Sequence, residues 1–244
     1  SVYQENSRHS VAMRYLPTGW TDIVIHANGT KVDYDYDSIG RPLKILNRAA
    51  NDDVLSQFDY QYDLNGNLLW AKRAGGYDYE KALGISYDNS GNVYICGLFR
   101  GSATFGGTTT IHSSGENDIF VAKYDANGNF IWVKKAGGSG RDEAKGIVCD
   151  GSGNIYICGM FKGNATFSGQ TVYAPDGYWN MFVAKYSTNG SLLWLKNEGG
   201  NWDDVAWSIT RDNSGKIYVA GEFNSSIDIG SDHLNTWGSA DIFV

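Results

Sequence analysis

The sequence predicts an all-β protein built from repeated four-stranded units, and three observations lead to that prediction. Five unlike residue types recur every 62 positions in the last three quarters of the chain. Runs of β-branched and aromatic residues alternate with Gly, Asn, Asp and Ser, which is typical of strands and hairpins. The 3.6-residue periodicity of helices is absent. The residues in register are Trp70, Trp132 and Trp194; Asp88, Asp150 and Asp212; Tyr94, Tyr156 and Tyr218; Gly97, Gly159 and Gly221; and Phe99, Phe161 and Phe223.

Each copy contains four strand-like runs, which in the middle copy cover residues 144–149, 154–161, 181–187 and 191–196. The run from Ile155 to Cys158 is apolar at successive positions, so we expect both faces of its sheet to be covered. Four antiparallel strands stacked between like units form a β-propeller blade. We therefore predict a β-propeller-like array over residues 57–244, with units near 57–118, 119–180 and 181–241.

The turns between these strands begin with an aspartate. In the segments 63–67 and 125–129 the Asp side chain is expected to accept backbone N–H groups, and the Gly closes a short hairpin. The same segments resemble the front of a calcium loop, but Ala74 and Ala136 stand where an EF-hand needs an acidic residue. Hairpin turns are the favoured interpretation. No cofactor is expected, and weak Ca²⁺ binding stays open as the alternative.

Longer excursions separate the second and third strands of each copy, at residues 100–117, 162–180 and 224–240. They differ most between copies, and variable loops on a repeated scaffold commonly carry recognition. Four tryptophan and tyrosine residues in or near them do not follow the repeat, namely Tyr178, Trp179, Trp202 and Trp237. Aromatic side chains of this kind suit sugar or protein contacts. Packing of each loop on its own blade explains them equally well.

Acidic residues follow the Gly-Gly turn of each copy. They are Asp78 and Glu80 in the first copy, Asp142 and Glu143 in the second, and Asp203 and Asp204 in the third. A ring of carboxylates at one end of the blades would bind a cation or a polar ligand. Capping of exposed backbone N–H groups is the favoured alternative. The candidate binding residues are Asp142, Glu143, Asp203, Asp204, Tyr178, Trp179, Trp202 and Trp237.

No residue is assigned a catalytic or metal-binding role. The histidines, at positions 9, 26, 112 and 233, do not repeat and are distant from one another in sequence. Cys96 and Cys158 occupy one repeat position whose third copy is Ala220, so they and Cys149 are expected to be free, buried thiols. Zinc-type spacings, phosphate loops and nucleophile motifs do not occur. We therefore expect a protein that is not an enzyme.

Composition and net charge limit the classes of partner that we expect. The 244 residues carry a net charge of −7, whereas nucleic-acid binding normally requires a basic face. No apolar run approaches the roughly 20 residues that span a bilayer. We therefore expect neither a nucleic-acid partner nor a membrane span.

Residues 1–56 read as hairpins rather than blades. The runs 21–27 and 30–36 flank Asn28-Gly29, which favours a tight turn. A Tyr-Asp…Gly motif occurs at 34–41 and again at 60–67. It resembles the YD, or RHS-type, repeat of bacterial toxin shells and surface proteins.

The 62-residue unit resembles the bacterial SBBP-type β-propeller repeat over about residues 57–244. The matching residues are 120–124 (FVAKY), Trp132, Gly137-Gly138, Asp142, Asp150–Gly153 and Tyr156. The resemblance implies a secreted or cell-surface bacterial repeat protein and carries no catalytic residues.

From these observations we expect a non-catalytic extracellular scaffold or adhesion module that binds a glycan or protein ligand. The incomplete first and last units lead us to expect further domains of a longer parent chain. Two alternatives stay open: a propeller-type polysaccharide lyase or glycosidase, and a shell segment of an RHS-type toxin or secretion apparatus.

Overall fold

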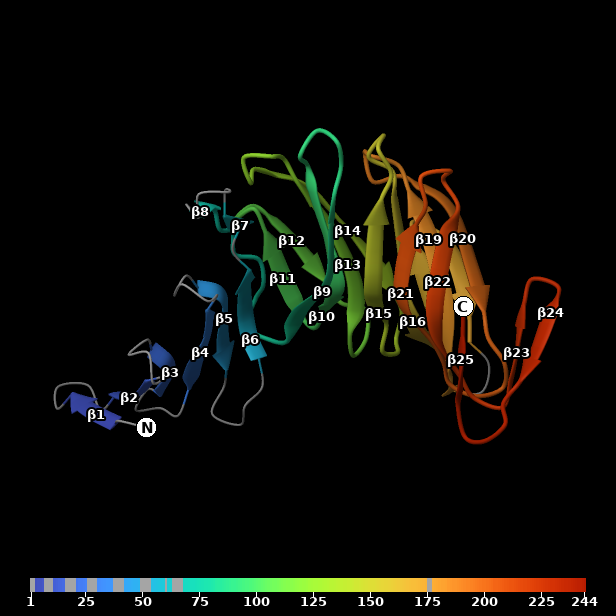
Figure 1. Cartoon of the computed structure of the whole chain (residues 1–244), viewed down its shortest axis with the longest axis horizontal. Coiled ribbons are helices and arrows are strands. Elements are labelled where there is room, and N and C mark those ends of the chain that lie inside the picture. The colour runs from blue at the N-terminus through green and yellow to red at the C-terminus, as the bar shows by residue number, and fades with distance from the viewer. Residues whose placement is uncertain are drawn as a thin grey trace.

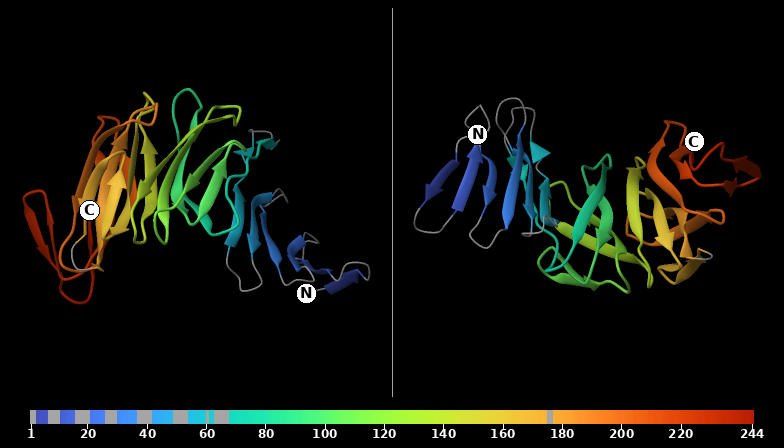
Figure 2. Two further views of the ribbon diagram at one scale, coloured as in Figure 1. Left: turned by 180° about the vertical axis from the view of Figure 1, so that it is seen from behind. Right: turned by 90° about the horizontal axis from the view of Figure 1, so that it is seen from below.

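The computed structural model describes residues 68–174 and 177–244 continuously. Before residue 68 it describes the segments 3–6, 11–15, 21–25, 30–36, 42–48, 54–59 and 61–62. The fold is all-β, as the sequence predicts, and its blades form a β-propeller-like array (Figure 1). Three antiparallel blades fan out side by side, which the two further views of Figure 2 also show.

Each blade begins directly after a Gly-Gly turn. The first contains β9 (Glu80–Tyr87), β10 (Val93–Phe99), β13 (Asp118–Tyr124) and β14 (Phe130–Gly137). The second contains β15 (Glu143–Cys149), β16 (Ile155–Lys162), β19 (Trp179–Tyr186) and β20 (Leu192–Glu198). The third contains β21 (Asp204–Arg211), β22 (Ile217–Phe223) and β25 (Asp241–Phe243). The four strands predicted for the middle copy are confirmed, with Cys149 opposite Ile155 as expected.

The excursions, which the sequence predicts as variable loops, contain regular secondary structure. Each folds into a β-hairpin: β11 (Ser102–Phe105) with β12 (Thr109–His112), β17 (Asn164–Phe167) with β18 (Gln170–Tyr173), and β23 (Ser226–Ile229) with β24 (Asp232–Asn235). The 62-residue register continues through them, because Ala103, Ala165 and Ile227 are all buried. The hairpins are therefore part of the repeated scaffold.

The hairpin of one unit is joined to the outer strand of the preceding blade. β17 pairs with β14 through Gly137 and Ala136, and Gly75 forms the same kind of bridge with Thr104. A Cβ on Gly138 would lie 1.7 Å from the carbonyl oxygen of Asn164, and Gly76 and Gly200 meet Ser102 and Ser226 in the same way. The second glycine of each pair is required because backbone approaches backbone there.

The cores lie between the blades. One cluster joins residues of the first and second blades, including Tyr94, Ile119 and Ile157. A second cluster joins the second and third blades and includes Cys158, Ile209 and Phe223. All seven residues of β13 are buried, and all of β16 except Lys162. Both faces of these strands are therefore covered, as their continuous apolar runs predicted.

The repeated tryptophans share one environment. Nε1 of Trp70 donates to the carbonyl oxygen of Ala126 at 3.1 Å, and Nε1 of Trp132 donates to that of Thr188 at 3.1 Å. The Trp132 and Trp194 rings lie 6.2 and 6.0 Å from the rings of Tyr94 and Tyr156. The periodic tryptophans thus fasten the outer strand of one blade to its neighbour.

The first part of the chain forms a separate six-stranded antiparallel sheet in sequence order. Its strands are β1 (Tyr3–Asn6), β2 (Val11–Tyr15), β3 (Thr21–Ile25), β4 (Lys31–Tyr36), β5 (Pro42–Arg48) and β6 (Val54–Asp59). β7 (Gln61–Tyr62) and β8 (Leu68–Trp70) pair with each other, and β6 contacts β9. The Asn28-Gly29 turn and the turns of both YD copies, residues 37–41 and 63–67, lie outside the described residues.

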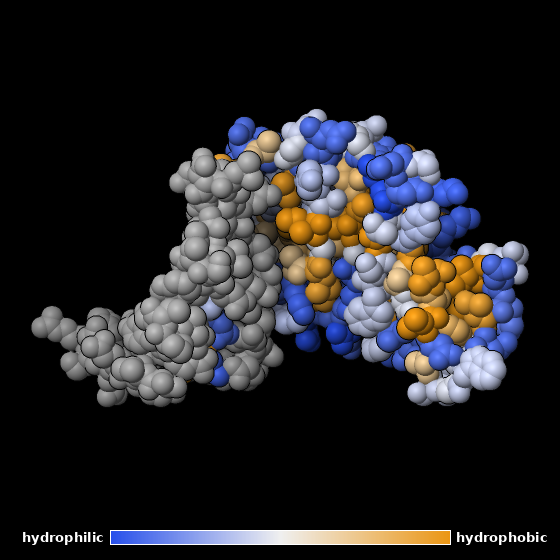
Figure 3. Space-filling model, in the orientation of Figure 1, coloured by the Kyte–Doolittle hydropathy of each residue, from blue (hydrophilic) through white to orange (hydrophobic). Residues whose placement is uncertain are grey.

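Apolar side chains also reach the surface. Figure 3 shows them gathering on the face of the last blade. Ile242 of that blade is 82% exposed, and its Tyr218 is 45% exposed. The equivalent tyrosine of the first blade, Tyr94, is fully buried. In the described part of the chain we find no helix suited to crossing a membrane.

Candidate functional site

The periodic acids are buried caps of the Gly-Gly turns. Asp142 accepts a hydrogen bond from Gly138 N–H at 2.7 Å and another from Lys162 N–H at 3.2 Å, and its side chain is fully buried. Asp204 accepts the equivalent bond from Gly200 at 2.6 Å. Glu80 occupies the same position in the first blade. These carboxylates hold the joint between blades, which is the capping role that the sequence favoured.

Burial sets the ionisation of these acids. Desolvation raises the pKa of Asp142 to about 7, although the bonds from Gly138 and Lys162 oppose the shift. Desolvation likewise raises the pKa of Asp204 to about 6. Glu80 has a pKa raised to about 7, and both of its carboxyl oxygens are buried without a hydrogen-bond partner. The longer Glu side chain does not reproduce the capping geometry of Asp.

The neighbouring acids have different roles. Glu143 is buried and forms ion pairs with Arg141 and Lys145. Asp203 accepts a hydrogen bond from the backbone N–H of Trp179 at 2.9 Å. The four acids predicted to form one rim therefore have three different roles. Asp142 and Asp204 cap turns, Glu143 is an ion-paired interior residue, and Asp203 binds the backbone at Trp179.

The structure brings three of the four off-period aromatic residues together. We call Tyr178, Trp179 and Trp202, with Asp203 and Lys162, the aromatic cluster. The rings of Tyr178 and Trp202 have centroids 5.0 Å apart and an interplanar angle of 42°. Lys162 Nζ lies 5.9 Å from the centroid of Trp179. The cluster combines flat apolar surface, a cation and a carboxylate at the boundary between the second and third blades.

Part of this cluster is open to solvent and part is held in place. Trp202, in the turn between β20 and β21, is 49% exposed. Trp179 begins β19, and its Nε1 is buried without a hydrogen-bond partner. The bond from Trp179 N–H to Asp203 ties the start of β19 to that turn. Such a half-buried arrangement presents an aromatic face with little conformational freedom.

Trp237 lies apart from the aromatic cluster. It follows β24, its side chain is 99% exposed, and its backbone N–H donates to Asp241 Oδ2 at 2.9 Å. None of its described neighbours forms a ring contact with it. The prediction that groups Trp237 with the other candidates therefore has no support from proximity.

The Asp-x-Asn-Gly-Asn segment at 125–129 has the geometry of a hairpin turn. Asp125 Oδ1 accepts the N–H groups of Asn127 and Asn129 at 2.9 and 2.7 Å, and Oδ2 accepts Asn129 Nδ2. The bond from the Asn129 side chain is the main reason that the pKa of Asp125 is lowered. Gly128 has a φ of 74°, the left-handed conformation expected of it. Segment 63–67 lies outside the described residues.

The remaining candidates are isolated. His112 Nδ1 lies 2.8 Å from Ser102 Oγ, and His233 Nδ1 lies 2.6 Å from Asp228 Oδ1, each on an excursion hairpin. His9 and His26 lie outside the described residues. Cys96, Cys149 and Cys158 are free and buried, as predicted. Within the described ranges, no group of three or more His, Cys, Asp or Glu residues is placed to hold a metal ion.

Sequence reasoning missed the cations that accompany the aromatic rings. Lys162 reaches Trp179, Lys145 Nζ lies 4.7 Å from the Trp207 centroid, and Lys185 Nζ lies 4.8 Å from that of Tyr156. Lys162 and Arg100 share one repeat position. The sequence signal for such contacts was the basic residue at the end of the second strand, Arg100 in one copy and Lys162 in the next.

Comparisons with known proteins agree with this geometry. Residues 131–160 match the family model described as the SBBP beta-propeller repeat. That segment runs from β14 through the Gly-Gly turn, Asp142 and β15 into β16, so it contains the link between the first and second blades. The SBBP resemblance is thereby confirmed for this segment, whereas nothing found supports the YD-type resemblance of the earlier residues.

Two proteins, one from a bacterium and one from a virus, are similar to part of the chain. The chain is 30% identical to the regulatory protein FlaEY of Caulobacter vibrioides, over 66% of the chain and 16% of the relative. It is 24% identical to an uncharacterized WD repeat-containing protein, L264, of Acanthamoeba polyphaga mimivirus, over 64% of the chain and 13% of the relative. The chain thus spans less than a fifth of either protein.

Proposed function

We propose that the chain is a non-catalytic repeat scaffold and binding module of a bacterial cell-surface or secreted protein, and that the aromatic cluster contacts a glycan. The observation that carries this proposal is the use of the repeated polar residues. Asp142 and Asp204 accept backbone N–H groups in the joints between blades. The residues that recur are thus engaged in holding the scaffold together.

The aromatic cluster supports the choice of a glycan. A tryptophan ring stacks its apolar face against the C–H face of a sugar ring, while nearby polar groups bond the hydroxyls. Trp202 is half exposed, and Asp203 and Lys162 provide an acceptor and a donor beside the rings. These groups come from two neighbouring blades, so the scaffold itself sets their spacing.

The same geometry gives less support to a polysaccharide lyase or glycosidase. Glycosidases act with two carboxyl groups that reach the scissile bond from the surface. Asp142 and Asp204 are both fully buried, and Glu143 is buried within ion pairs. Raised pKa values at Asp142 and Asp204 follow from burial in a turn and do not by themselves favour catalysis.

The cell-surface location rests on the SBBP-type repeat. The two relatives carry names that describe a regulatory protein and a WD repeat-containing protein, so they give no direct support to adhesion. A location outside the cell is tested by antibody labelling of intact cells before and after protease treatment. Labelling only after lysis would contradict it.

A glycan array, followed by calorimetric titration of any glycan retained, tests the binding role. We expect Trp202→Ala to weaken binding at least tenfold, because the exposed ring is lost. Trp237→Ala is the matched control and should leave binding unchanged, because that exposed ring is isolated. Equal loss in both variants would contradict the assignment. Turnover of a lyase or glycosidase substrate by the purified chain would contradict the non-catalytic role.

A further inference from the structure

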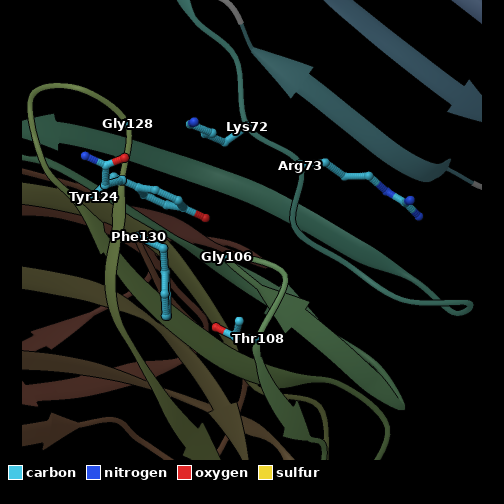
Figure 4. A pocket seen from close by; sticks show the side chains of 8 residues that line it. Lys72, Arg73, Gly106, Thr108, Tyr124, Gly128 and Phe130 are labelled. Atoms are coloured by element: carbon cyan, nitrogen blue, oxygen red, sulfur yellow. The ribbon is translucent and has the colours of Figure 1, made fainter.

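A second site lies on the outer edge of the first blade, away from the aromatic cluster. Three segments enclose a pocket of about 320 Å³: residues 72–73 after β8, the turn of the β11–β12 hairpin at 106–108, and the β13–β14 turn at 128–130, with Tyr124 as the remaining lining residue (Figure 4). Small-molecule sites begin at roughly 300 Å³. The pocket is therefore large enough for one compact ligand ring.

The base of the pocket is aromatic and rigid. The Tyr124 ring stacks on Trp70 with centroids 6.3 Å apart and meets Phe130 edge-on at 5.9 Å. Tyr124 is only 4% exposed, and burial raises its pKa to about 12, so the hydroxyl keeps its proton at neutral pH. Its hydroxyl bonds to none of the described residues and points into the open space in Figure 4.

Two cations border the pocket without an ion-pair partner among the described residues. Lys72 and Arg73 are exposed, and neither forms an ion pair with any described residue. Lys135, which stands one 62-residue repeat after Arg73 and lies on β14, is instead held by Asp118 at 3.3 Å and by Ser114 Oγ at 2.6 Å. The segment before the first blade therefore offers positive charge, whereas the equivalent residue on β14 uses its charge internally.

The nearest described acids form no ion pair with Lys72 or Arg73. Asp125 lies close enough to Lys72 for their charges to interact, but both Asp125 oxygens accept hydrogen bonds from Asn127 and Asn129. Arg73 similarly acts on Glu80, which is buried below the Gly-Gly turn. Lys72 and Arg73 thus remain able to bind an anionic ligand.

Glycine keeps the mouth of the pocket open. Gly106 has a φ of 61°, and a Cβ there would lie 2.6 Å from the Phe130 ring. The second blade has Ser168 at the equivalent position, where it adopts a φ of 49° that non-glycine residues seldom take. The hydroxyl of Thr108 and the amide of Asn129 complete the rim.

From these features we propose that the pocket binds one acidic sugar unit, a hexuronate of a polysaccharide chain. The aromatic base accommodates the C–H face of the ring, and Lys72 and Arg73 bind its carboxylate by charge-assisted hydrogen bonds. Tyr124, Thr108 and Asn129 supply partners for the ring hydroxyls. The site is distinct from the aromatic cluster and does not depend on the glycan assignment made there.

The test is a calorimetric titration of the whole chain with a tetramer of galacturonate. The matched neutral tetramer of galactose and sodium sulfate are titrated separately. We expect binding of the acidic tetramer to weaken with salt and to exceed binding of the neutral tetramer at least tenfold. Saturation by sulfate with equal affinity would show a general anion site and overturn the sugar assignment. Absence of binding at millimolar galacturonate would overturn the proposal altogether.

Variants of the residues that line the pocket test where galacturonate binds. The double variant K72Q/R73Q should lose at least tenfold in affinity, and Tyr124→Phe should lose a smaller factor because only the hydroxyl is removed. The control K196Q/K216Q removes the same charge from two exposed lysines, one on β20 of the second blade and one in the β21–β22 turn of the third. An equal loss in the control would reduce the effect to net charge and contradict the site. Circular dichroism of each variant confirms that it folds, and Trp237→Ala, at an isolated exposed ring, should leave galacturonate binding unchanged.

Discussion

The Gly138 backbone N–H donates a hydrogen bond to Asp142 Oδ2 at 2.7 Å, and the carboxylate that accepts it has no exposed surface. The bond favours the ionised carboxylate, whereas burial favours the neutral acid. Burial is the larger effect, because the pKa of Asp142 rises to about 7. The same conflict recurs at Asp204, and burial also raises the pKa of Glu80. The joints between blades thus carry three acids that change charge near neutral pH.

Stability should therefore fall as pH rises from 5 to 8. The ordinary pKa values of Asp and Glu are 3.8 and 4.5, and the folded values of these acids are about 6 to 7. The folded state binds these protons more tightly than the unfolded state, so protonation stabilises the fold. This stabilisation is fully present below the ordinary pKa values and is lost as the pH rises through the folded pKa values. Each unit by which a folded pKa exceeds the ordinary pKa corresponds to ~1.4 kcal/mol in the free energy of unfolding. Urea unfolding followed by tryptophan fluorescence measures the slope.

Asp142→Asn is the variant that tests this cause. It should change less in stability between pH 5 and 8 than the natural chain, because one of the three titrating groups is gone. Asp125→Asn serves as the control, since the pKa of Asp125 is lowered and the group stays ionised throughout that range. An unchanged slope in Asp142→Asn would show that Asp142 does not titrate between pH 5 and 8.

Gly138→Ala should destabilise the chain by more than about 3 kcal/mol. The added Cβ would lie 1.7 Å from the Asn164 carbonyl oxygen, so the β14–β17 pairing must separate. Gly238→Ala is the matched control, because a Cβ there meets nothing within 4 Å and should change stability by less than about 0.5 kcal/mol. Urea unfolding of both variants provides the comparison. A small effect at Gly138 would mean that the hairpin is not fixed to the preceding blade.

Trp132→Phe and Trp70→Phe should cost similar amounts of stability, about 1–2 kcal/mol each. Both indoles donate to a carbonyl oxygen at 3.1 Å, from Thr188 and Ala126 respectively, and phenylalanine leaves that acceptor without its donor. Thermal unfolding measured by circular dichroism gives the two values. Strongly different losses would contradict the equivalence of the two joints.

The repeat register allowed much of the blade structure to be predicted, because periodicity reports equivalent environments. Trp70 and Trp132 recur at one spacing and share one hydrogen bond. The requirement for Gly138 was not predictable, since it arises from pairing between β14 and the hairpin of the next unit. Tyr178 and Trp202 were each noticed, but their contact depends on how two blades meet. The pocket beside Lys72 carried no sequence signal, because within the described residues Arg73 lacks the acidic partner that the equivalent Lys135 has.

The three cysteines should be unreactive in the folded protein. Burial raises the pKa of Cys149 and Cys158 to about 12 and also raises that of Cys96, so the thiolate that reacts with disulfide reagents is scarce at pH 8. Titration with Ellman's reagent should detect no thiol in native protein and 3 per chain in guanidinium chloride. Cys149 should react first when denaturant is raised, because it lies beside the Asp150 turn at the end of β15. Cys149→Ser identifies that phase by removing it. Rapid labelling of Cys96 or Cys158 in native protein would contradict the packing between blades.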